Sequence, residues 1–163
     1  EFLSRNIRIL RDKNSMKIGE RISSFMKRLG EGDRVFIILS DKYLKSTYCM
    51  TELFEVFKNC REDGDEFIKR TRVFVLPCAK ITNPGDRAQY AIYWKQRSEE
   101  LDKIVREHGP NMLSDDDNAD FRRMTRFVTD TANILKLVQD TLHPRTFDEF
   151  LQHGFDEPPL TMQ

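Results

Sequence analysis

The sequence lacks an excess of charge of either sign, because its 27 lysines and arginines are balanced by 27 aspartates and glutamates. A chain with balanced charge has no general attraction to nucleic acid or to an anionic membrane. Cysteines are few, and the three present, Cys49, Cys60 and Cys78, have no CxxC spacing. This pattern argues against a disulfide framework and against a zinc site. We therefore predict no direct nucleic-acid binding and no metal site.

Long apolar runs are also absent. No stretch approaches the roughly 20 apolar residues that span a bilayer, and the first residues lack the basic and apolar regions of a signal peptide. We therefore predict a soluble, cytoplasmic protein without a membrane segment. Histidine is scarce as well, and His108, His143 and His153 have no serine and aspartate arrangement around them. We interpret these histidines as surface residues.

Short apolar segments predict strands. Val35–Leu39 and Val73–Leu76 are apolar at every position, which is typical of parallel strands that helices cover on both faces. The β-branched segment Ile7–Leu10 predicts an earlier strand. Strands that alternate with helices predict an α/β fold with a doubly wound parallel sheet, whose ligands bind at the carboxyl ends of the strands.

Helices are predicted between and after these strands. One apolar stripe runs from Ile18 to Leu29, and a second helix begins at Ser46 or Thr47. Two long helices follow, over about 86–108 and about 121–142, and Gly109-Pro110 separates them. In the last helix Thr131 fills the one gap in the apolar stripe, so we expect an amphipathic helix.

The segment Phe36–Leu53 is the most informative part of the sequence. An apolar strand ends at Ser40, the turn Tyr43-Leu-Lys-Ser46 follows, and Tyr48-Cys-Met-Thr-Glu52-Leu opens the next helix. This order of residues resembles the central motif of the Toll/interleukin-1 receptor (TIR) family.

Two further segments are similar to the same family. Arg11–Ile22 resembles the loop after the second strand of a TIR domain, where a glycine precedes an isoleucine of the next helix. Arg87-x-x-Tyr90-x-x-Tyr93-Trp94 is similar to a segment of a bacterial TIR subgroup. We expect the three aromatic residues to pack on the sheet.

The resemblance covers about residues 5–142 and implies the flavodoxin-like fold of TIR domains. It assigns a TIR domain to residues 1–142 and a C-terminal tail or linker to residues 143–163. The first strand and first helix of that fold precede Ile7 and are missing from this sequence. Because the first strand is central in the fold, we expect a longer chain or a partner to supply it.

The resemblance also implies an activity. TIR domains of bacteria, plants and one animal lineage cleave the nicotinamide–ribose bond of NAD with a glutamate that corresponds to Glu52 here. Departure of nicotinamide leaves positive charge on the ribose, which a nearby carboxylate stabilises without a metal. We therefore expect an NAD glycohydrolase that forms ADP-ribose or a cyclic ADP-ribose, acts in bacterial defence, and has NAD as substrate rather than as cofactor.

Neighbouring residues complete the expected site. Ser46 and Tyr48 are placed beside the substrate, and Arg11 and Lys13 near its pyrophosphate. Simpler interpretations exist: Tyr48 as a packing residue, the two cations as solvated loop residues, and Glu52 as a carboxylate that opposes the helix dipole. Helical geometry places Glu52 at the border of the apolar face, whereas Glu55 points more squarely to solvent.

A second function remains open from the sequence. A non-catalytic TIR module signals by association with itself or other TIR domains through the loop at residues 11–19. In either case we expect assembly through TIR domains and a sensor domain that is fused to the chain or bound to it. A phospho-receiver domain fits poorly, because Ser40 rather than an aspartate follows the central strand.

Overall fold

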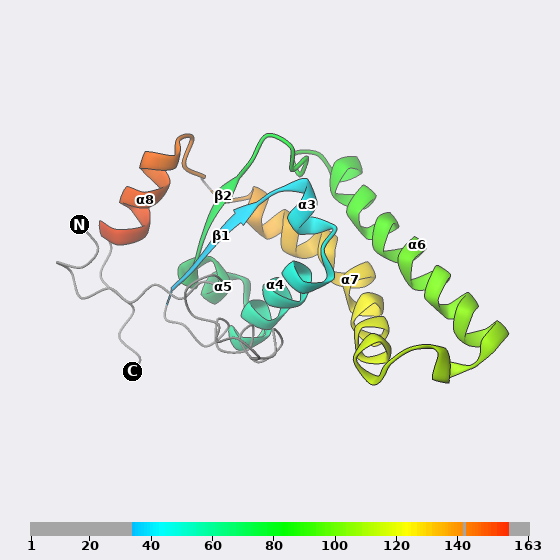
Figure 1. Cartoon of the computed structure of the whole chain (residues 1–163). Helices are drawn as coiled ribbons and strands as arrows, with labels where there is room; N and C mark the ends of the chain where they lie inside the picture. The colour runs from blue at the N-terminus through cyan, green and yellow to red at the C-terminus, as the bar shows by residue number, and fades with distance from the viewer. Residues whose placement is uncertain (1–33, 142, 157–163) are drawn as a thin grey trace.

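The computed structural model describes residues 34–141 and 143–156. This part of the chain is mixed α/β and mostly helical, with a two-stranded parallel sheet (Figure 1). The strand predicted at Ile7–Leu10 and the helix predicted over Ile18–Leu29 lie outside the described residues. None of the helices within the described ranges combines the length and the apolar composition that a membrane crossing needs.

Both apolar segments that predicted strands form strands in the structure. Strand β1 spans Val35–Leu39, as predicted, and β2 spans Thr71–Val75, so it begins two residues before the predicted Val73 and ends one residue before the predicted Leu76. The strands run parallel, with Val35 opposite Thr71 and Leu39 opposite Val75. Both carboxyl ends therefore lie at one edge of the sheet.

Helices fill most of the rest of the described chain. In order they are α3 (Asp41–Leu44), α4 (Thr47–Asn59), α5 (Gly64–Arg70), α6 (Pro84–His108), the 3₁₀ turn η2 (Pro110–Met112), α7 (Asp115–Gln139) and α8 (Phe147–Asp156). Capping residues determine where several of these helices begin or end. Ser46 caps α4, as one of the two predicted alternatives, and Ser114 forms a capping box with Asp117 at the start of α7. Gly109 ends α6 with a φ of 92°, which a residue without Cβ adopts at no steric cost.

The main core lies on one side of the sheet, where α4 and α7 pack (Figure 1). Its members share nearly complete burial: Ile37 and Leu39 of β1, Met50, Leu53 and Val56 of α4, and Phe127, Thr131, Ile134 and Leu135 of α7. Thr131 is 1% exposed, which confirms its place in the apolar stripe. The ring of Phe127 joins α4 and α6, because its centroid lies 4.9 Å from Phe54 and 5.0 Å from Trp94.

The opposite face of the sheet is covered by α8 (Figure 1). The segment predicted as a weakly patterned tail thus contains a helix whose Phe150 ring lies 5.6 Å from Phe36 and 5.5 Å from Phe74. This cover is incomplete, since Ile38 is 46% exposed. The prediction that both faces of β1 are fully covered is therefore wrong at Ile38, because the ring contacts of α8 are made at Phe36 and Phe74.

The packing of α8 on the sheet can be tested with two phenylalanines of the same helix. Phe150→Ala removes a ring that is 3% exposed, so we expect the free energy of unfolding to fall by about 3 kcal/mol. Phe147→Ala removes a ring that is 48% exposed and that contacts Phe74 only at its edge, so we expect a loss of about 1 kcal/mol. Chemical denaturation measures both changes, and equal losses would contradict the packing described above.

Candidate functional site

The turn after β1 is built by two serines of the motif. The Ser40 hydroxyl accepts a hydrogen bond from the backbone N of Tyr43 at 3.0 Å and so caps α3. The Ser46 hydroxyl accepts one from the backbone N of Cys49 at 3.4 Å and caps α4. Ser46 therefore lies at the helix start, as predicted, and its oxygen has a structural partner there.

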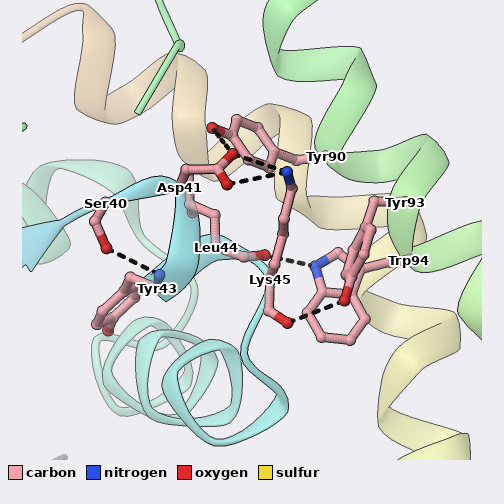
Figure 2. Close-up of polar contacts among 8 residues, drawn as sticks. All are labelled: Ser40, Asp41, Tyr43, Leu44, Lys45, Tyr90, Tyr93 and Trp94. Carbon is pink, nitrogen blue, oxygen red and sulfur yellow. Dashed lines mark hydrogen bonds and ion pairs between the residues drawn. The ribbon is translucent and has the colours of Figure 1, made fainter. Parts of the chain in front are cut away.

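Three side chains of α6 hold this turn in place (Figure 2). Their hydrogen bonds run from the Tyr90 hydroxyl to Asp41 Oδ1 (3.2 Å), from the Tyr93 hydroxyl to the Lys45 carbonyl (3.2 Å) and from Trp94 Nε1 to the Leu44 carbonyl (2.9 Å). The spacing of the donors places them on one face of the helix. We call these three donors and their acceptors the α3–α6 clamp.

The clamp brings together two of the segments that carried the family resemblance. We expected its aromatic residues to pack on the sheet, but their hydrogen bonds are made to α3 and to Lys45, and the ring of Trp94 lies against Phe127 of α7. Trp94 is 1% exposed, so its indole N–H needs an acceptor inside the protein. The carbonyl at the end of the short helix α3 provides that acceptor.

Arg87 is the first residue of the same motif and has a structural role. Its side chain is buried, and Nη1 donates to the carbonyls of Ile81 at 2.7 Å and Thr82 at 3.0 Å. A buried guanidinium is stabilised by such acceptors. Arg87 thereby fixes the loop between β2 and α6, and with it the position of the clamp residues.

Asp41 is the polar centre of the clamp. Its carboxylate receives hydrogen bonds from Tyr90 and from Lys45 Nζ, the latter at 3.0 Å. Burial and then the charge and hydrogen bond of Asp41 raise the pKa of Tyr90 to about 12. Tyr90 consequently keeps its proton and remains a donor over the whole physiological pH range.

A cleft of about 420 Å³ lies beside the clamp. Its lining includes the charged residues Asp41, Lys45, Lys80 and Asp86 and the two tyrosines Tyr90 and Tyr93. The cleft lies beyond the carboxyl ends of both strands, where doubly wound sheets bind ligands. A smaller cleft of about 70 Å³ lies between β2, the start of α8 and the end of α7. Of the described site residues, Glu52, Ser46 and Tyr48 line neither of these two clefts.

Glu52 lies in the second turn of α4 and is half-buried. Glu55 is half-buried too, so exposure does not separate the two carboxylates as we expected. The charge of Glu52 acts on two neighbours. Burial mainly, and then Glu52, raises the pKa of the Tyr43 hydroxyl and that of the Cys49 thiol. Cys49 is therefore a protonated, half-buried thiol and has no nucleophilic character of its own.

The other predicted site residues fall into two groups. Tyr48 is 56% exposed, so it is not a core packing residue and its ring is accessible on the first turn of α4. Ser46, Tyr48 and Glu52 thus follow one another along the start of a single helix. Arg11 and Lys13 lie outside the described residues.

Sequence reasoning missed Asp41, Tyr43 and their contacts, because it treated residues 40–47 as a polar connection. The signal was present, since Ser40 and Ser46 are both capping residues and a helix cap is readable from sequence. Within the described ranges no group of three or more histidine, cysteine, aspartate or glutamate side chains is arranged to hold a metal ion.

Comparisons with known proteins return no relative. No protein-family model matches the chain, and no curated protein or solved structure is significantly similar to it.

The effect of Asp41 on the pKa of Tyr90 can be tested by measuring the stability of the folded chain as a function of pH. Because the folded chain holds the Tyr90 proton until about pH 12 while the unfolded chain loses it near pH 10, the free energy of unfolding should fall as pH rises through that window. Tyr90→Phe should weaken this fall, and at pH 7 it should cost about 1.5 kcal/mol through the lost hydrogen bond to a carboxylate.

Tyr93→Phe is the matched control for this experiment, because the Tyr93 hydroxyl donates to a neutral carbonyl. It should cost only about 0.5 kcal/mol at pH 7, less than Tyr90→Phe. Denaturant unfolding curves from pH 7 to about pH 11 provide both quantities. Identical slopes for the wild type and Tyr90→Phe would contradict the assigned pKa.

Proposed function

We propose that this chain contains a TIR domain of the NAD-cleaving type, with Glu52 as the carboxylate that stabilises the reacting ribose. The observation that carries the proposal is the segment from Ser40 to Glu52, in which two capped helices follow strand β1 in the order of the family motif. The finer fold assignment belongs to the same proposal. Strands β1 and β2 are then the third and fourth strands of a flavodoxin-like sheet.

The location of Glu52 supports this activity. Its helix follows β1 after the short helix α3, and Glu52 lies about one turn beyond Tyr48. Half-burial lowers the local dielectric around a carboxylate and strengthens its effect on a nearby positive charge. The accessible ring of Tyr48 is suited to contact a planar part of the substrate.

The chemistry needs few groups. The bond between ribose C1′ and the nicotinamide nitrogen breaks, and its electron pair leaves with neutral nicotinamide. The ionised Glu52 stabilises the positive charge that develops on the ribose. Attack of water on C1′ gives ADP-ribose and a proton, whereas attack by an adenine nitrogen gives a cyclic product. Arg11 and Lys13 are proposed to meet the pyrophosphate.

The α3–α6 clamp has a supporting role in this proposal. It fixes the carbonyls of Leu44 and Lys45, which directly precede the cap of α4. A shift of a catalytic group by even about 1 Å lowers the reaction rate strongly. We infer that the clamp keeps the start of α4, and therefore Glu52, at a constant distance from the sheet edge.

The second candidate is a non-catalytic TIR module that signals through self-association. It is favoured by one observation, namely that Glu52 does not line either of the two described clefts. In this case the loop at residues 11–19 provides the interface, and Tyr48 belongs to the exposed surface of α4.

Two glutamates of α4 separate the candidates. In the full-length protein incubated with NAD, Glu52→Gln should reduce nicotinamide release at least about 100-fold, because it removes the charge that stabilises the transition state. Glu55→Gln is the matched control, since Glu55 is half-buried on the same helix three residues later. It should retain activity within about twofold of the wild type.

Chromatography of the released nicotinamide provides the measurement. An active wild type with two equally active variants would refute the role of Glu52. A folded, assembled wild type without activity would favour the signalling module instead.

Assembly gives a further prediction. Nicotinamide release per protein molecule should rise with protein concentration, because TIR domains complete their substrate cleft with a loop of a neighbouring copy. Light scattering on the same samples should show larger assemblies as specific activity rises. Constant specific activity across a wide concentration range would count against this requirement.

A further inference from the structure

The hydroxyl of Tyr43 is the buried polar group of the site that has no use in the proposal above. Its oxygen is inaccessible to solvent and has no hydrogen-bond partner among the described residues. The ring packs against the core, and the backbone N of the same residue donates to Ser40. The ring is therefore held in place while its polar end is unsatisfied.

An unsatisfied buried hydroxyl destabilises the folded chain, because it has given up its hydrogen bonds to water. Folding alone would favour phenylalanine at this position. A ligand can provide the missing partner of such a group. Figure 2 shows Tyr43 on the other side of α3 from Tyr90, so the hydroxyl does not belong to the α3–α6 clamp.

The groups near this hydroxyl indicate which ligand it fits. Glu52 of α4 is the carboxylate whose negative charge acts on it. Burial mainly, and then the charge of Glu52, raises the pKa of Tyr43 well above its ordinary value, so the hydroxyl keeps its proton and acts as a donor. An ionised carboxylate is only an acceptor. A hydroxyl donor together with a carboxylate acceptor matches an alcohol, which accepts from one and donates to the other.

We propose that Tyr43 is a positioning residue of the Glu52 site, whose hydroxyl donates to a ribose hydroxyl of the substrate while Glu52 accepts from the same group. The inference rests on the proposed NAD cleavage. It assigns to Tyr43 no part in bond breaking, because no proton needs to leave its hydroxyl. Its effect is to orient the sugar against the carboxylate.

Tyr43→Phe removes only the oxygen and tests the proposal. For the full-length protein with NAD we expect kcat/KM to fall about tenfold, mainly through KM, as for the loss of one hydrogen bond to the ligand. The Tm without ligand should stay the same or rise, because the oxygen has no partner to lose. The increase in Tm that saturating ADP-ribose produces in the wild type should shrink in the variant.

The stability measurement separates this role from a structural one. Tyr93→Phe removes a hydroxyl that has a partner, so its Tm should fall while that of Tyr43→Phe does not. A lower Tm for Tyr43→Phe, or an unchanged KM and an unchanged response to ADP-ribose, would overturn the inference. In both cases the loss of activity in Glu52→Gln would leave the proposed function standing. A wild type that neither releases nicotinamide nor responds to ADP-ribose would overturn both.

Discussion

The described fold depends on how the chain is held after it leaves β1. Helix α3 is only four residues long, and a helix of that length is not stable without outside partners. Its last carbonyl accepts the buried indole N–H of Trp94, and Tyr93 and Tyr90 add two more hydrogen bonds from the same face of α6. A short local turn thereby becomes part of the core, and α4 can start at a fixed position.

This arrangement separates two sides of α3. On one side Asp41, Lys45 and Tyr90 satisfy one another and border the larger cleft. On the other side the Tyr43 hydroxyl is buried near Glu52 without a partner of its own among the described residues. The first side is complete as a structural unit. The second has one hydroxyl, that of Tyr43, whose hydrogen bonding a ligand can complete.

The sheet shows a similar division. The face toward α4 and α7 is tightly packed, whereas the face toward α8 is covered by a small cluster of phenylalanines and leaves Ile38 half-exposed. Phe150 is the most completely buried of the α8 side chains that the structure describes, which are those of residues 147–152. A short helix that contributes one such anchor depends on the strands beneath it for most of its stability.

The sequence by itself determined the elements whose causes are local. The bounds of β1 and the end of α6 at Gly109 follow from apolar runs and capping residues, and the structure confirms them. The sequence predicts the cap of α4 at Ser46 or Thr47, and the structure selects Ser46. The order of the motif residues in the sequence is also the basis for proposing Glu52 as the catalytic carboxylate. Only the tertiary structure decided that Tyr90 meets Asp41, because these residues are 49 positions apart. It likewise decided that α8 covers the sheet, since the ring contacts of Phe150 join it to strands that are distant in the sequence.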